Sequence, residues 1–200
     1  DMHFLYNTLE CIQSMAMLSG ADEAARVVKA LSDMFRYASR VQETTVRVRD
    51  ELEYVQDYIY IQRARFGEKV NCITMVEPQY LGRRILKMSL QPLVENAFKH
   101  GFKKARGIYN IYISCMETEG KLQLRVSDNG VGMDPERLCA VQEGLCQEEE
   151  GSGGIGLGNV SKRMKLCFGE EARMRIESIP GEGTVVILEF PHRGLEEDGK

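Results

Sequence analysis

The stretch ENAFKHG, residues 95–101, is the first of four short segments whose order along the chain decides the fold. It closes a compact apolar segment that we expect to form a helix from Leu90 to His100, ending at Gly101. Asn96 carries an amide oxygen, the hard kind of ligand that Mg²⁺ accepts. Lys99 and His100 follow three and four residues later, so an α-helix would place them on one face with Asn96. That face can hold a metal ion and meet phosphate charge, although Asn96 alone could also be a satisfied buried amide.

Three glycine-containing segments follow: DNGVGM at 128–133, GGIGLGN at 153–159 and GEGT at 181–184. Asp128 ends an apolar strand, where a carboxylate can accept a hydrogen bond from an exocyclic amine such as that of adenine. Gly130 and Gly132 let the backbone approach a flat ring closely. A glycine loop at the start of a helix presents free N–H groups to phosphates. Each segment alone is more often an ordinary turn. Together, and in this order, they predict a nucleotide site.

The ordered set resembles the N, G1, G2 and G3 boxes of the GHKL ATPase fold, which gyrase, heat-shock chaperone, histidine kinase and MutL proteins share. The P-loop pattern GxxxxGK[ST] does not occur in the chain. Two further stretches, HFLYN at 3–7 and QPLVENA at 91–97, are similar to the phosphoacceptor motif and the N box of LytS-like (YesM-like) sensor histidine kinases. The resemblance covers roughly residues 3 to 191. It implies an α+β protein: a short helical hairpin followed by a two-layer α/β-sandwich ATPase domain.

Carried over by that likeness, the hairpin supplies a phosphoacceptor and the ATPase domain supplies a Mg·ATP site. His3 would accept the phosphoryl group, Asn96 would ligate Mg²⁺, and Glu95 would act as a base or orienting group. Residues 134–153 would form the ATP lid. The remaining residues implied to bind the nucleotide are Lys99, His100, Asp128, Gly130, Gly132, Met133, Gly154, Ile155, Gly156, Leu157 and Thr184.

The resemblance implies the cytoplasmic catalytic core of a sensor histidine kinase in a two-component system. Such a core autophosphorylates and passes the phosphate to an aspartate of a response regulator, acts as a homodimer, and is anchored in the membrane by a segment upstream of this chain. Asp1-Met2 stands where the subgroup has Asn-Pro, and Phe4 stands where other subgroups carry an acidic residue. Two alternatives therefore stay open: an ATP-binding dimerisation module without autokinase activity, or an ATP-driven conformational machine.

The periodicity divides the chain into a helical hairpin at 1–42, an ATP-binding domain at 43–192 and a polar tail at 193–200. Ser19-Gly20 separates the two helices of the hairpin, and Asp22 is expected to cap the second. A lone hairpin buries little, so we expect a partner, which is either the rest of the chain or a second copy in a four-helix bundle. The apolar stripes are Leu5, Leu9, Ile12 and Ala16, then Ala24, Val28, Leu31, Phe35 and Ala38.

Beyond the hairpin, the patterns predict helices on one face of an antiparallel-rich sheet. The expected helices are 50–66, 90–100, 135–145 and 157–168, and the expected strands are 45–48, 70–76, 110–116, 121–128, 173–178 and 184–190.

Composition narrows the class of protein further. The chain has 200 residues, 43% hydrophobic and 28% charged, which excludes a disordered chain or a disulfide miniprotein. A net charge of −4 argues against nucleic-acid binding. Six cysteines without a CxxC pair favour reduced thiols in the cytosol over a metal site. The chain opens at Asp1 without an initiator methionine, and we expect it to be a piece of a longer protein.

Overall fold

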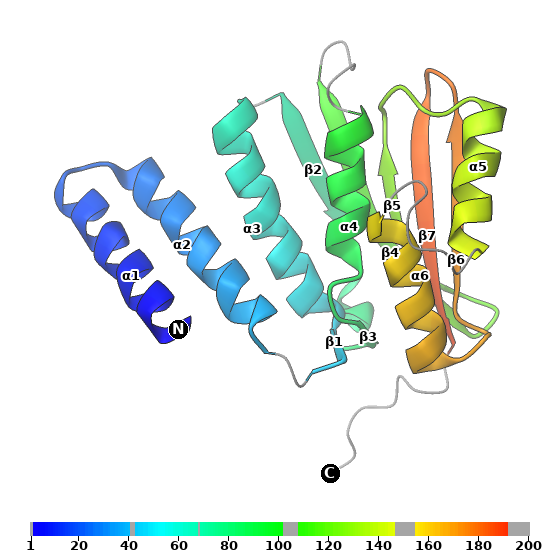
Figure 1. Cartoon of the computed structure of the whole chain (residues 1–200), viewed down its shortest axis with the longest axis horizontal. Coiled ribbons are helices and arrows are strands. Elements are labelled where there is room, and N and C mark those ends of the chain that lie inside the picture. The colour runs from blue at the N-terminus through cyan, green and yellow to red at the C-terminus, as the bar shows by residue number, and fades with distance from the viewer. Residues whose placement is uncertain (1, 41–42, 68, 102–107, 147–154, 192–200) are drawn as a thin grey trace.

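The computed structural model describes residues 2–40, 43–67, 69–101, 108–146 and 155–191 of the chain (Figure 1). It opens with a hairpin of two helices, α1 (Met2–Leu18) and α2 (Asp22–Ala38), which pack against each other. Gly20, with φ of 72°, makes the turn between them. Asp22 is the first residue of α2 and does not cap it, because the N-cap position is Ala21 and no side-chain cap bond forms.

The rest of the described chain forms two layers, a five-stranded sheet with helices on one face (Figure 1). The strand order is β2-β4-β5-β7-β6, antiparallel throughout except for the parallel pair β2 and β4. The strands are β2 (Val70–Met75), β4 (Tyr109–Thr118), β5 (Lys121–Asp128), β6 (Arg173–Ile179) and β7 (Gly183–Pro191).

Four helices cover this sheet, namely α3 (Val48–Phe66), α4 (Leu90–Asn96), α5 (Pro135–Cys146) and α6 (Ile155–Phe168). A small antiparallel pair, β1 (Thr45–Arg47) and β3 (Arg84–Leu86), lies beside α3. Pro78–Tyr80 forms one 3₁₀ turn ahead of β3. The sequence did not predict β3, because three residues are too few to show a periodicity of their own. The expected α+β class and its sandwich are confirmed.

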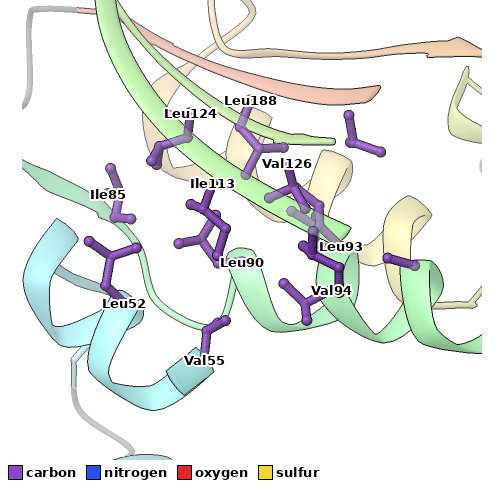
Figure 2. Close-up of a cluster of buried hydrophobic side chains, with 14 of the residues drawn as sticks. Leu52, Val55, Ile85, Leu90, Leu93, Val94, Ile113, Leu124, Val126 and Leu188 are labelled. Atoms are coloured by element: carbon purple, nitrogen blue, oxygen red, sulfur yellow. The ribbon is translucent and has the colours of Figure 1, made fainter. Parts of the chain in front are cut away.

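The core lies between the helices and the inner face of the sheet. Side chains alternate along β4 and β5 between buried and half-buried positions, as a sheet with one covered face requires. Figure 2 shows one cluster in which Leu52 and Val55 of α3 and Leu93 of α4 lie on the helix side and Ile113 and Leu124 lie on the sheet side. Each side chain of this size contributes roughly 1.5–3 kcal/mol by leaving water. This packing fixes α4 against the sheet, and α4 carries Asn96.

The hairpin is attached to the rest of the chain through its second helix, because α1 packs on α2 and α2 packs on α3. Several apolar side chains of α1 stay uncovered within the chain: Phe4, Ile12 and Met15 are 71%, 46% and 64% exposed. Phe35 of the α2 stripe is also 36% exposed. Among the described helices, none is both long enough and apolar enough to cross a membrane.

Candidate active site

Asp128, the last residue of β5, lies at the centre of the predicted nucleotide site. The pairing of β5 with β7 places it opposite Thr184, which the sequence also singled out. Its carboxylate accepts a hydrogen bond of 2.8 Å from the backbone N–H of Gly130. Burial raises the pKa of Asp128 above its ordinary value, while hydrogen bonds with Gly130, Tyr109 and Thr184 oppose that shift. A half-buried carboxylate with this support is a suitable acceptor for an exocyclic amine.

Tyr109, which sequence reasoning missed, joins Asp128 to the end of α4. The side chain is fully buried, and its hydroxyl donates to the carbonyl oxygen of Ala97 at 2.8 Å. Burial raises the pKa of Tyr109 above its ordinary value, and the Asp128 carboxyl group, with which the same hydroxyl interacts, raises it further. Because Ala97 follows Asn96 directly, Tyr109 links the candidate adenine ligand Asp128 to the residue next to the candidate metal ligand. The sequence carried no signal for it, because Tyr109 lies one residue before the strand expected at 110–116, whereas β4 begins at Tyr109.

The backbone after Asp128 packs closely against the turn between β6 and β7. Gly132 has φ of 63°, and a Cβ there would lie 2.0 Å from the carbonyl oxygen of Ile179. Gly183 has φ of 118°, and its Cβ would lie 1.9 Å from the carbonyl oxygen of Asp128. Both glycines are therefore required by the packing of one backbone on another, in addition to any approach to a ring.

The hydroxyl groups of Ser178 and Thr184 also hold the backbone after Asp128 against the β6–β7 turn. Ser178 accepts a hydrogen bond from the N–H of Met133 at 2.8 Å and lies 2.8 Å from the carbonyl oxygen of Gly183. Its Oγ is also 2.9 Å from the hydroxyl oxygen of Thr184. Met133, Gly183 and Thr184 thus share Ser178, and this serine was not predicted because its role depends on the pairing of β6 with β7.

Replacing Gly183 by alanine is expected to destabilise the fold and remove nucleotide binding. The new Cβ would overlap the Asp128 backbone, and the positive φ would add strain, so we expect a loss of about 3 kcal/mol or more in the free energy of unfolding. Gly181→Ala is the matched control, because Gly181 has φ of 81° but nothing within 4 Å of its Cβ position. That control should lose only about 1–2 kcal/mol in urea titrations. Equal losses for both variants would contradict the packing argument.

The helix that carries Asn96 changes its winding at that residue. Asn96 is half-buried at the end of α4, and Ala97–Gly101 continue as a wider π-helical turn. The α-helical spacing expected between Asn96 and Lys99 therefore does not apply, and Lys99 is exposed. Glu95 is also exposed and accepts a hydrogen bond of 2.6 Å from Gln91. The side chain of His100 lies outside what the structure describes.

The first turn of α6 lies against α4. A Cβ at Gly156 would be 3.4 Å from the Cβ of Pro92, and Leu157 is 9% exposed. The start of α6, at Gly156 and Leu157, is thus next to α4, which carries Asn96. A phosphate site formed by the N-terminus of α6 and by Asn96 requires this arrangement. Gly154 and the side chain of Ile155 lie outside the described residues.

Only part of the predicted lid can be located. Residues 135–146 form α5, which packs on β6 and donates from Gln142 to the carbonyl oxygen of Ile176 at 2.9 Å. Residues 147–153 lie outside the described ranges. The lid assignment therefore stays a prediction.

His3 is not brought to this site. It lies on α1, exposed, with its Nδ1 3.3 Å from the side-chain nitrogen of Asn7. Helices α2 and α3 stand between α1 and α4 (Figure 1). Within the described ranges no group of three or more metal-ligating side chains occurs. A Mg²⁺ ion held by one protein oxygen together with substrate phosphates and water would fit Asn96.

Two family models match the chain. Residues 1–70 match the model described as histidine kinase, and residues 83–194 match the model described as histidine kinase-, DNA gyrase B- and HSP90-like ATPase. An uncharacterized sensor-like histidine kinase of Staphylococcus epidermidis is 35% identical over 189 residues. The sensor protein kinase HptS of Staphylococcus aureus is 34% identical over 189 residues. Each alignment covers 94% of this chain but 36% of the relative, so the chain spans about a third of their length.

Solved structures are similar in fold. The histidine kinase domain of the Erythrobacter litoralis EL346 blue-light activated histidine kinase gives a TM-score of 0.55 at 15% identity, covering 96% of this chain and 97% of that one. The catalytic domain of histidine kinase ThkA gives 0.54 at 19% identity and covers 74% of this chain and 95% of that one. At these identities the likeness establishes the fold of the hairpin and the sandwich.

Proposed function

The chain belongs to the histidine kinase family and carries the ATPase domain of that family, and from this we propose that it is the catalytic core of a sensor histidine kinase. In this role it transfers the γ-phosphoryl group of ATP to His3 and then to an aspartate of a response regulator. The observation that supports this most directly is the Asp128–Tyr109–Ala97 connection, which links the candidate adenine ligand to the residue after the candidate metal ligand Asn96, in a chain that also carries an HFLYN segment. The longer protein would be anchored in the membrane, with this core in the cytoplasm.

The chemistry requires a nitrogen nucleophile and a site that neutralises phosphate charge. A neutral imidazole nitrogen of His3 forms the P–N bond while the bond from phosphorus to the bridging oxygen breaks and ADP leaves. The imidazole proton passes to a base, a role for which Glu95 is our candidate. Asp128 and Thr184 hold the adenine, and the backbone at the start of α6 faces the phosphates. A Mg²⁺ ion at Asn96 would offset their negative charge.

The position of His3 requires either a movement of the hairpin or a second copy of the chain. We infer a homodimer in which the two hairpins form a four-helix bundle. The uncovered apolar side chains of α1 and α2 support it, since a bundle would bury Ile12, Met15 and Phe35 against their copies.

Ile12→Glu is expected to prevent this dimer. A charge at the centre of the apolar face would have to be buried without a partner, which we expect to weaken association at least about 100-fold. Sedimentation of the chain at several concentrations gives the dissociation constant. Leu166→Glu is the control, because Leu166 is 86% exposed on α6, away from the hairpin. A dimer unchanged by Ile12→Glu would place the interface elsewhere.

Incubation with γ-labelled Mg·ATP tests the proposed function against its two alternatives. Acid-labile, alkali-stable label on the protein is the result that histidine phosphorylation predicts. Steady release of phosphate without labelled protein would instead identify an ATP-driven conformational machine. Nucleotide binding with neither label nor release would leave an ATP-binding dimerisation module.

A further inference from the structure

Glu51, on α3, is buried away from the nucleotide site yet accepts hydrogen bonds from four donors. The residue is 0% exposed. Its two carboxylate oxygens accept the backbone N–H groups of Met88 at 2.5 Å and of Ser89 and Leu90 at 2.9 Å each. The hydroxyl of Tyr37, on α2, is the fourth donor. A buried carboxylate is tolerated only where its oxygens are satisfied in this way.

The three N–H groups belong to the start of α4, which no local side chain caps. Ser89 is at the N-cap position, but its hydroxyl makes no cap bond and is buried without a partner among the described residues. Met88 has φ of 55°, a conformation that a side chain of this size rarely adopts. Glu51 therefore supplies the acceptors that a helix N-terminus needs and holds a strained residue in place.

The same segment is contacted from two other helices. Lys87 donates from Nζ to the carbonyl oxygen of Arg40 at 2.5 Å and lies 5.1 Å from the centre of the Tyr37 ring. Arg163 of α6 donates to the carbonyl oxygen of Lys87 at 2.7 Å. Residues 87–90 are thus where α2, α3, α4 and α6 are joined, and Glu51 is the buried acceptor at this junction.

We propose that Glu51 is a positioning residue for Mg·ATP: through the start of α4 it sets the place of Asn96 relative to Asp128. Asn96 is six residues beyond Leu90, a rise of about 9 Å along the helix, so a tilt of about 10° at the start would move it by about 1.6 Å. A displacement of that size is enough to disrupt metal coordination. The inference rests on the proposed function in that Asn96 is taken as the metal ligand.

Glu51→Gln tests the proposal with two probes, Mg·ATP and adenosine. The glutamine amide keeps the size but turns an NH₂ group toward N–H donors, so part of the cluster loses its acceptor. We expect the affinity for Mg·ATP to fall at least about tenfold, while the affinity for adenosine, which contacts the Asp128 side only, stays within about twofold. Glu53→Gln, at an exposed position on the same helix, should change neither affinity.

Tyr37→Phe is the second variant, and it decides the matter if Glu51→Gln does not fold. It keeps the ring that packs on Tyr54, with centroids 4.7 Å apart, and removes one donor to Glu51. We expect Mg·ATP affinity to fall about two- to fivefold with adenosine binding unchanged. An unchanged Mg·ATP affinity in this variant, or an equal loss for both probes, would overturn the proposal. So would a wild type that binds Mg·ATP no more tightly than adenosine.

These affinities do not depend on phosphoryl transfer. If the wild type binds Mg·ATP without becoming labelled, the kinase proposal is contradicted. The titrations of Glu51→Gln and Tyr37→Phe with Mg·ATP and adenosine would still decide the role of Glu51.

Discussion

His3→Ala is expected to abolish acid-labile phosphate on the protein, lowering the rate of labelling by at least about three orders of magnitude. The methyl group that remains has no lone pair to attack phosphorus, whereas the imidazole nitrogen is a competent nucleophile near neutral pH. Affinity for Mg·ATP should stay within about twofold of the wild type, because α2 and α3 separate α1 from the nucleotide site. Counting protein-bound label after incubation with γ-labelled Mg·ATP measures the first quantity, and calorimetry with a non-hydrolysable analogue of Mg·ATP measures the second.

Glu10→Ala is the matched control for this experiment. Glu10 is exposed on α1, seven residues beyond His3 and on the same helical face, and it carries no nucleophile. Its labelling should equal that of the wild type. Equal label on His3→Ala and the wild type would show that the phosphate is attached elsewhere, and the assignment of His3 would be lost.

Asp128→Asn is expected to weaken nucleotide binding about 10- to 100-fold, the value of a buried hydrogen bond to a charged group. The substitution keeps the size of the side chain but places an NH₂ group among donors, namely the Gly130 N–H and the amine of the base. Calorimetry with Mg·ADP measures the affinity. Glu182→Gln, which removes one negative charge at an exposed position in the β6–β7 turn, should leave it unchanged. Identical affinities for Asp128→Asn and the wild type would exclude Asp128 as the adenine ligand.

The pH dependence of nucleotide affinity and of folding stability distinguishes a direct loss of nucleotide binding in Asp128→Asn from a loss caused by unfolding. Burial raises the pKa of Asp128, so the folded state binds a proton more tightly than the unfolded state does. Folding stability therefore decreases as pH rises through the interval between the unfolded and folded pKa values, and ionised Asp128 does not stabilise the fold at pH 7. Asp128→Asn should lack this pH dependence of stability, which urea titrations at several acidic pH values would measure. Nucleotide affinity of the wild type should fall on acidification through that raised pKa, and the variant should not show this fall.

The sequence predicted the elements that depend on local pattern and missed those that depend on contacts between distant segments. Asp128 and the glycine segments were identifiable because strand alternation and turn residues are read within a few positions. Tyr109 was missed because its role arises from β4 meeting the end of α4, some twelve residues away. Glu51 resembles an ordinary surface acid on an amphipathic helix, and only the packing of α3 against residues 88–90 buries it. The π-helical turn after Asn96 likewise has no sequence signature comparable to a cap or a proline.

Helices α1 and α2 follow each other directly in the sequence, so the hairpin can form early when the chain folds. Contacts within the hairpin join segments close in sequence, and such contacts form early because little loop entropy is lost. The sheet must instead pair Val70 with Tyr109 and Asp128 with Thr184, which requires most of the chain to have been synthesised. The two hairpin helices would therefore begin to pair on the ribosome while the ATPase layer is still unformed, and, because a lone hairpin buries little, a second copy would stabilise them. Two neighbouring nascent chains could then associate through their hairpins before either can bind nucleotide.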